Sequence, residues 1–153
     1  MTSGTKRSEP FAALWPKAPT PSEPLEERLR GEAMRFDQLR AANVTRCEQV
    51  FHKLIEWNAL EWAGAMCGEA GEAANVAKKL KRLDVADADK DTPEERLRLR
   101  RALAEELADV VIYADLLAAR EHIDLGRAVI DKFNKVSHAR GARIFLRGAR
   151  IFL

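Results

Sequence analysis

The chain has few of the residues on which several classes of protein depend. Its 153 residues include two cysteines, one tyrosine and 7% aromatic residues. Cys47 and Cys67 form neither a disulfide framework nor a zinc-ligand spacing, so we expect reduced thiols. No apolar run approaches the roughly 20 residues that cross a bilayer, and no hydrophobic signal segment opens the chain. We therefore expect a soluble, cytoplasmic protein without a membrane partner.

An excess of one charge is also absent. The 26 lysines and arginines nearly balance the 24 aspartates and glutamates, which gives a formal net charge of +2. This excess is too small to predict an electrostatic surface for nucleic acid, so we expect no nucleic-acid partner. A content of 46% hydrophobic and 33% charged residues is ordinary for one soluble domain of this length.

Proline is nearly absent from the body of the chain. Five of the six prolines stand within residues 1–24, at positions 10, 16, 19, 21 and 24. Proline removes an amide donor and disfavours helix in the preceding residue, so this segment is expected to be an extended arm. Its apolar residues Phe11, Leu14 and Trp15 either dock on a neighbouring subunit or belong to a disordered leader.

The C-terminal residues 141–153 contain a direct repeat of Gly-Ala-Arg-Ile-Phe-Leu. A repeat this short does not build a solenoid, which stacks longer units at least three times. A short strand or hairpin and a duplication outside the folded domain both remain open. The folded domain is accordingly expected to span residues 25–140.

Within residues 25–140 the apolar residues recur at helical spacing, and the strict alternation typical of strands is missing. Residues 25–57 predict one long helix, or two helices divided near Asn43. Three further helix starts follow: Asn58 with Glu61 and Thr92 with Glu95 have capping-box form, and Asp124 caps the last helix. The expected ranges are about 59–82, 93–121 and 125–137. The connection 83–92 is short enough for antiparallel neighbours, so the sequence predicts an all-α bundle of four to five helices.

Two of these predicted helices each carry a pair of carboxylates three residues apart, Glu69 with Glu72 and Glu106 with Asp109. A helix turns such a pair onto one side, and at about 100° per residue Glu69 and Glu106 fall within apolar stripes. Glu105 projects away and is expected to be solvated. The stripe around Glu69 comprises Trp62, Met66, Ala73, Ala77 and Leu80, and that around Glu106 comprises Leu99, Leu103, Val110, Tyr113 and Leu117.

Carboxylates that face a core destabilise the fold unless they are paired or bind a cation. The four carboxylates therefore predict a metal site on two neighbouring helices. Oxygen-only ligands favour a hard ion, Mg²⁺ or Mn²⁺, over zinc. The alternative is that each carboxylate lies at the boundary of its stripe and reaches water, as most charged helix faces do.

The two motifs also resemble a known group of enzymes. Gly-Glu-x-Gly-Glu at 68–72 and Glu-Leu-Ala-Asp-Val-x-Ile-Tyr at 106–113 are similar to motifs of the all-α nucleoside triphosphate pyrophosphohydrolases, the MazG-like and dCTP pyrophosphatase-like enzymes. The resemblance covers about residues 34–138 and continues in Ile-Asp-Leu at 123–125 and Lys-Phe-Asn at 132–134. The chain departs from it in a longer gap between the motifs and in Gly68, where many members carry a further glutamate.

This resemblance implies a MazG-like homo-oligomer, a dimer or tetramer, that hydrolyses a (d)NTP to a (d)NMP and pyrophosphate with Mg²⁺, in nucleotide-pool housekeeping. It implies Glu69, Glu72, Glu106 and Asp109 as the metal ligands. The number of metal ions stays open, and Gly68 leaves the general base unassigned.

The resemblance also indicates substrate contacts. Tyr113 matches the family's tyrosine and is expected to contact sugar or phosphate, and Lys132 and Asn134 resemble the segment that closes over substrate. Trp62 shares a stripe with Glu69 and is expected to stack on a base. For both aromatic residues, packing in the core is the alternative, and the sequence leaves the base and the sugar open.

A function of another class remains to be weighed, a non-catalytic helical bundle that binds a partner protein or a nucleotide. The proline-rich arm and the repeated tail favour it because they have the composition of interaction segments. The placement of Glu69 and Glu106 in apolar stripes opposes it, since a scaffold gains nothing from carboxylates that face its core.

Overall fold

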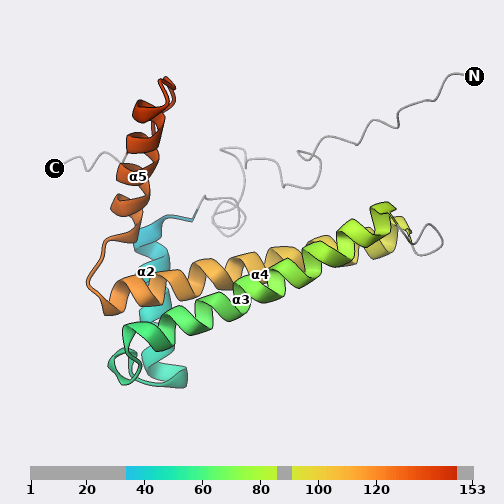
Figure 1. Cartoon of the computed structure of the whole chain (residues 1–153). Helices are drawn as coiled ribbons and strands as arrows, with labels where there is room; N and C mark the ends of the chain where they lie inside the picture. The colour runs from blue at the N-terminus through green and yellow to red at the C-terminus, as the bar shows by residue number, and fades with distance from the viewer. Residues whose placement is uncertain (1–33, 86–90, 148–153) are drawn as a thin grey trace, which may run out of the picture. The chain divides into compact units, whose positions relative to one another are not determined.

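The computed structural model describes residues 34–85 and 91–147. All regular elements in these ranges are helical, which confirms the predicted all-α class (Figure 1). The predicted arm at 1–24 and the end of the repeated tail lie outside the described residues, and the domain boundaries stay predictions. The elements are α2 (Phe36–Arg46), the π-helix η2 (Cys47–Phe51), the 3₁₀ helix η3 (Leu54–Glu56), α3 (Ala59–Val85), α4 (Pro93–Arg120) and α5 (Leu125–Ala139).

The two carboxylate helices α3 and α4 lie side by side along their length and run antiparallel, as predicted (Figure 1). Buried or half-buried residues line the contact, and on both helices steps of three and four residues alternate. We call this line of residues the α3–α4 seam. It comprises Trp62, Met66, Glu69, Ala73, Val76, Leu80 and Leu83 on α3, with Leu99, Leu103, Glu106, Val110, Tyr113 and Leu117 on α4.

Alternating steps of three and four give a period of about 3.5 residues, the spacing of helices packed as a coiled coil. The seam therefore drifts from the stripe that a straight period of 3.6 predicts. Val76 is buried at 7% exposure, whereas Ala77, expected in the stripe, is exposed. The expected residues of the α4 stripe are all buried or half-buried, and Glu105 is exposed as predicted.

The first residues of α3 confirm the predicted capping box. Asn58 Oδ1 accepts hydrogen bonds from the backbone N–H groups of Leu60 at 2.9 Å and Glu61 at 3.1 Å. The Glu61 carboxylate in turn accepts from the Asn58 backbone N–H at 2.7 Å. These bonds satisfy amides that have no partner within the helix.

The starts of α4 and α5 follow the same logic with one difference. Thr92 Oγ1 accepts from the Glu95 N–H at 3.1 Å, and Asp124 Oδ1 accepts from the Arg127 N–H at 2.9 Å. The Glu95 carboxylate, which a full capping box would direct back to Thr92, instead pairs with Arg98 at 2.6 Å. The cap is therefore confirmed and the box is half formed, because a nearby cation competes for the carboxylate.

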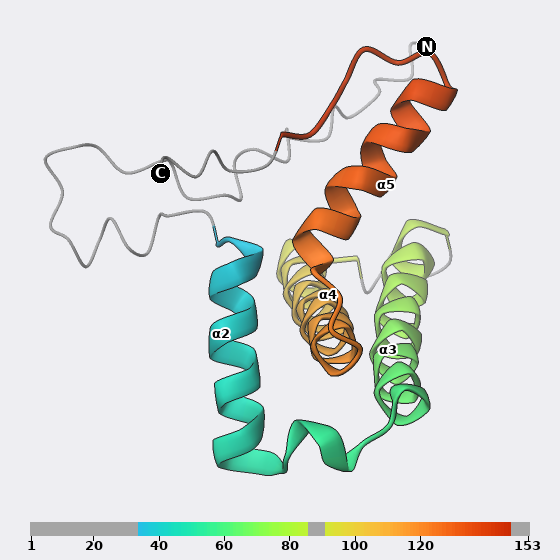
Figure 2. The ribbon, with the colours of Figure 1, turned by 90° about the vertical axis from the view of Figure 1, so that its left-hand side faces the viewer.

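The segment before α3 differs from the prediction in where the helix changes. α2 runs through Asn43, near which one of the two alternatives placed a break, and the Asn43 side chain bonds to α4 while its backbone stays helical. The change comes at Cys47, where the π-helix η2 begins. At the end of η2 the His52 N–H donates to the Cys47 carbonyl at 3.0 Å. Figure 2, which looks along α3 and α4, shows α2 passing beside α4.

Two apolar clusters support this arrangement. One lies toward the α3–α4 connection and contains Val76, Leu83 and Leu99. The other joins η2 to the opposite end of the seam through Cys47, Trp62 and Leu116. Both cysteines are free, as expected. None of the described helices is long and apolar enough to cross a membrane.

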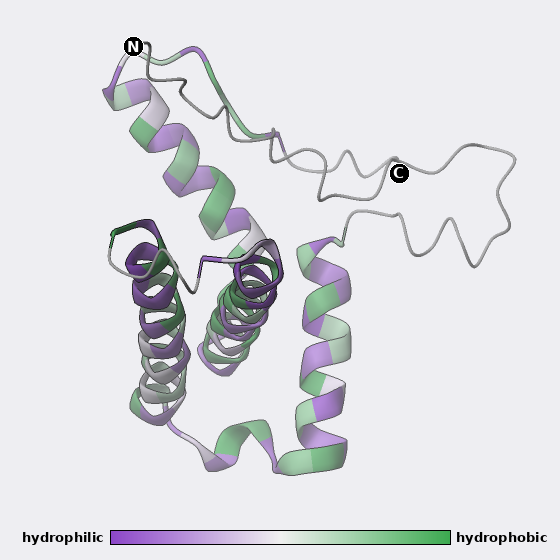
Figure 3. Ribbon diagram, turned by 90° about the vertical axis from the view of Figure 1, so that its right-hand side faces the viewer, coloured by the Kyte–Doolittle hydropathy of each residue, from purple (hydrophilic) through white to green (hydrophobic). Residues whose placement is uncertain are grey.

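Helix α5 makes its main contact with α2. A side chain at Gly126 would come within 3.1 Å of the Phe36 Cβ atom, so the glycine permits the close approach of the two helices. Along α5 hydrophobic and hydrophilic residues alternate in patches (Figure 3). Its apolar residues Val129, Phe133 and Val136 are exposed.

Candidate functional site

Three carboxylates come together across the middle of the α3–α4 seam. Glu69 from α3 and Glu106 and Asp109 from α4 each offer an oxygen within 4.8 Å of the others, and all three side chains are half-buried. Glu69 and Glu106 are seam residues, so the packing of the two helices directs them at each other. Oxygen atoms at this separation can hold one hard cation.

The fourth predicted ligand, Glu72, lies at the edge of this group. It is exposed and does not belong to the three whose oxygens converge. It is nevertheless close enough to raise the pKa of Glu106 by its charge. The structure thus brings three of the four predicted carboxylates together and leaves the fourth at the rim.

The electrostatics of the group favour a bound cation. Partial burial, followed by the negative charges of Glu72 and Glu69, holds the pKa of Glu106 above its usual value of 4.5. Asp109 and Glu105 add smaller contributions of the same sign. Like charges held this close repel one another, and a divalent ion relieves the repulsion. The residues present therefore fit a metal site of oxygen ligands.

A cavity of about 400 Å³ adjoins the carboxylates, and Asp109 belongs to both. Its wall is rich in aromatic rings and contains a single arginine. The lining residues are Arg46, Cys47, Phe51, His52, Trp57, Trp62, Asp109, Ile112, Tyr113 and Leu116. Five of these residues lie between positions 46 and 57, where the π-helix η2 and the turn after it lead the chain from α2 to the start of α3.

The rings of this cavity form a continuous cluster. The His52 ring stacks on Trp62 at 5.4 Å between centroids, and Trp57 lies 4.8 Å from His52 and 4.7 Å from Trp62. Tyr113 follows at 6.2 Å from Trp62. Rings at these separations pack favourably, and their apolar faces suit a planar ligand. The sequence analysis assigned no role to Trp57 or His52.

Trp62 fits the core-packing alternative better than the role of stacking on a base. Its side chain is 2% exposed, and its Nε1–H donates to the Leu54 carbonyl at 3.2 Å. It forms the buried floor on which the half-buried rings of His52, Trp57 and Tyr113 rest. Tyr113 lines the same cavity as Asp109.

Within a single chain, the contacts of the described residues do not bring Lys132 or Asn134 to the carboxylates of Glu69, Glu106 and Asp109. Asn134 exchanges two hydrogen bonds with the Leu146 backbone, at 2.9 Å and 2.8 Å, and so holds the tail against α5. Lys132 lies on the exposed side of α5 beside Val129 and Phe133. The prediction that both close over substrate therefore finds no support within the single chain, because α5 makes its main contact with α2.

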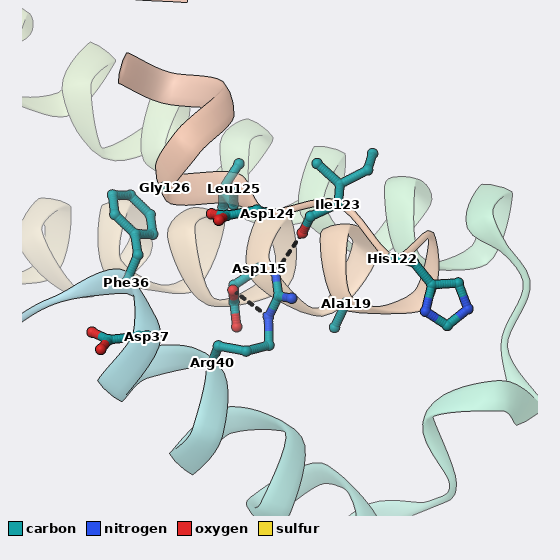
Figure 4. A pocket seen from close by; sticks show the side chains of 10 residues that line it. All are labelled: Phe36, Asp37, Arg40, Asp115, Ala119, His122, Ile123, Asp124, Leu125 and Gly126. Atoms are coloured by element: carbon teal, nitrogen blue, oxygen red, sulfur yellow. Dashed lines mark hydrogen bonds and ion pairs between the residues drawn. The ribbon is translucent and has the colours of Figure 1, made fainter. Parts of the chain in front are cut away.

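A buried polar network was missed by the sequence analysis. Asp115 on α4 is 1% exposed and accepts from Arg40 Nε at 2.9 Å and from Asn43 Nδ2 at 3.2 Å. Arg40 also donates to the Ile123 carbonyl at 3.1 Å, beside a second cavity of about 460 Å³ (Figure 4). The available signal was a lone aspartate within the apolar run 110–118, since a buried charge requires a partner.

Comparison with known proteins identifies one similar enzyme. No protein-family profile matches the chain. No solved structure matches it either. A stretch of 70 residues, 46% of this chain, is 43% identical to dCTP pyrophosphatase 1 of Rattus norvegicus and spans 38% of that protein. The chain is thus similar over this stretch to a dCTP pyrophosphatase, which confirms the resemblance to dCTP pyrophosphatase-like proteins that its two carboxylate motifs indicated.

Proposed function

We propose that this protein is a Mg²⁺-dependent nucleoside triphosphate pyrophosphohydrolase. Water would add to the α-phosphorus while the bond to the β-phosphate oxygen breaks, which yields a monophosphate and pyrophosphate. The observation that carries the proposal is the convergence of Glu69, Glu106 and Asp109 within 4.8 Å beside an aromatic cavity. The similarity of 70 residues to a dCTP pyrophosphatase supports it.

Each part of the site has a role in this proposal. The carboxylates of Glu69, Glu106 and Asp109 would hold the ion. Glu72, at the rim of the group, would become a further ligand of the ion when the substrate binds. When bound, Mg²⁺ would neutralise phosphate charge and activate water for attack on phosphorus. Mn²⁺, which takes the same oxygen ligands, is the expected substitute.

The aromatic cavity would hold the base. Its volume of about 400 Å³ lies within the range of ligand pockets, about 300–1,000 Å³. His52 Nδ1 lies 3.0 Å from the Lys53 carbonyl oxygen, which can only accept, so Nδ1 carries the proton. In the neutral ring Nε2 is then an acceptor, which suits a base with an exocyclic amine such as cytosine.

We also propose that the protein assembles as a homo-oligomer. The apolar side chains of Val129, Phe133 and Val136 on α5 are 39%, 41% and 46% exposed. Burial of these side chains against another copy would remove apolar surface from water. Light scattering coupled to gel filtration would test the assembly, and a monomer at micromolar concentration would contradict it.

The experiment that tests the function is a pyrophosphate-release assay with a panel of triphosphates. Release from at least one (d)NTP should require Mg²⁺ and stop on addition of EDTA. Among pyrimidines, a cytosine nucleotide should be preferred over a uracil nucleotide. Binding without turnover of any triphosphate would instead favour the non-catalytic nucleotide-binding bundle.

A further inference from the structure

Arg46 is the one cationic side chain among the residues that line the aromatic cavity. It is the last residue of α2, and Asp109 of the carboxylate group lies in the wall of the same cavity. The side chain is exposed, and the ion pairs of the described residues do not include it. Arg46 thus brings a positive charge to the wall of a space that a ligand can enter.

A chain of hydrogen bonds sets the position of this arginine. Arg46 Nη2 donates to Asn43 Oδ1 at 3.1 Å. The Asn43 amide nitrogen donates to the Ile112 carbonyl at 2.9 Å and to Asp115 Oδ2 at 3.2 Å. The Ile112 carbonyl and the ionised Asp115 carboxylate are acceptors only, so the amide nitrogen of Asn43 must face them. The Asn43 oxygen is consequently the atom left to face Arg46.

The network behind Asn43 is rigid because it is buried. Asn43 is 3% exposed and Asp115 1% exposed, and Arg40 Nε holds the other Asp115 oxygen at 2.9 Å. A buried amide with satisfied donors has one low-energy orientation, since a flip would leave its groups unpaired. Asn43 uses one of the five N–H groups of Arg46 and leaves the rest of the guanidinium for a ligand.

We propose that Arg46 contacts the phosphates of the bound nucleotide, and that Asn43 and Asp115 are positioning residues for it. The inference rests on the proposed function, which supplies the nucleotide. If the base lies among the aromatic rings and the phosphates lie beside Asp109, the polyphosphate chain runs along the wall that contains Arg46. Arginine binds phosphate through paired N–H donors, and here it would offset the negative charge of the nearby carboxylates.

The test compares the binding of a nucleotide and its nucleoside by titration calorimetry. The probes are dCTP and deoxycytidine, or the best triphosphate of the panel and its nucleoside. R46A should weaken triphosphate binding by about tenfold or more, the size expected for a charged hydrogen bond. Nucleoside binding should stay within twofold, and R46K should recover part of the loss because it keeps the charge. The matched control R140A removes an exposed arginine at the end of α5 and should bind both probes as the wild type does.

The positioning role has its own readout. N43A should weaken triphosphate binding by about threefold without changing nucleoside binding, because Arg46 loses a neutral hydrogen bond. In the double variant N43A/R46A the loss should equal that of R46A alone, since Asn43 acts through the arginine. Additive losses would overturn the positioning role. Because Arg46 is exposed, R46A should fold as the wild type does, and circular dichroism checks this.

The opposite results are equally informative. Triphosphate binding by R46A within twofold of the wild type overturns the phosphate contact, and so does an equal loss of nucleotide and nucleoside. If R46A behaves in this way while pyrophosphate release still depends on Mg²⁺ and Asp109, the proposed function stands and this inference alone fails. A wild-type protein that binds no triphosphate overturns both.

Discussion

The two ends of the α3–α4 seam share one spacing of residues but differ in chemistry. Toward the connection, Val76, Leu83 and Leu99 pack as an apolar cluster. Arg96 closes that end through ion pairs with Asp84 at 2.8 Å and with Asp91. Toward the start of α3, the same spacing leads to Glu69 and Glu106 and then to an aromatic cavity.

The difference shows how a small helical protein can remain folded with carboxylates in the contact between two of its helices. Unpaired carboxylates that face a core destabilise the fold, so another part of the same contact must supply the apolar burial. Here one end of the seam holds the two helices together, and the middle presents charges that a cation can use. Predictions that separate stability from activity test this division.

The largest expected effect is the loss of stability at the apolar end. Leu99 is 2% exposed, and L99A should lower the free energy of unfolding by about 2–5 kcal/mol because it leaves a cavity. The control L97A shortens a leucine that is 37% exposed on the same helix and should cost less. Urea denaturation measures both. Equal losses for the two variants would show that this end does not hold the helices together.

The next effect is the loss of activity at the carboxylates. D109N removes the negative charge of one of the three converging carboxylates. It should lower Mg²⁺-dependent pyrophosphate release by about a hundredfold or more, while helix content stays unchanged. E105Q removes the charge of an exposed neighbour on α4 and serves as the control, with near wild-type turnover expected. Full activity of D109N would refute the assignment of this carboxylate.

Metal binding should stabilise the fold through the same group. An ion that binds only the native state raises the free energy of unfolding by about 2.7 kcal/mol at a hundredfold excess over its dissociation constant. Thermal denaturation with Mg²⁺ and with EDTA measures the difference, and E106Q should reduce it. A melting temperature indifferent to Mg²⁺ and Mn²⁺ would contradict a metal site here.

The pH dependence of the metal-free protein should carry the sign that the raised Glu106 pKa dictates. Because the native state binds this proton more tightly than the unfolded chain, the free energy of unfolding should fall as pH rises from 4.5 through the raised value. E106Q should flatten this part of the curve, whereas E105Q should change it less. Urea denaturation in EDTA from pH 4 to 7 provides the measurement. A curve that falls more steeply, or rises less, in E106Q than in the wild type would agree with the opposite shift.

The smallest expected effect concerns His122, just after the end of α4 and beyond the last seam residue Leu117. His122 has a φ of 56°, in the left-handed region that glycine adopts without strain. H122G should therefore change the free energy of unfolding by at most about 1 kcal/mol, in the stabilising direction if strain outweighs the added chain entropy. Thermal denaturation measures it, and a loss of several kcal/mol would show that the imidazole itself supports the fold.

Local features of the sequence were sufficient for the helix starts and for the pairing of carboxylates. Asn58, Thr92 and Asp124 cap their helices through bonds to residues two or three positions away, which any short peptide window contains. The stripe positions of Glu69 and Glu106 follow from helical periodicity alone. The exposure of Ala77 does not, because the period changes when two helices pack against each other.

What the sequence by itself determined is therefore the all-α class, the starts of three helices and two matched pairs of acids, since these depend on neighbours within about one turn. Tertiary structure decided that three of the four acids converge, that residues after α2 form an aromatic cavity, and that Lys132 and Asn134 stay with α5. It also joined Asn43 to Asp115 across 72 positions. Contacts over such separations depend on how whole helices pack, and helix packing is a property of the assembled core.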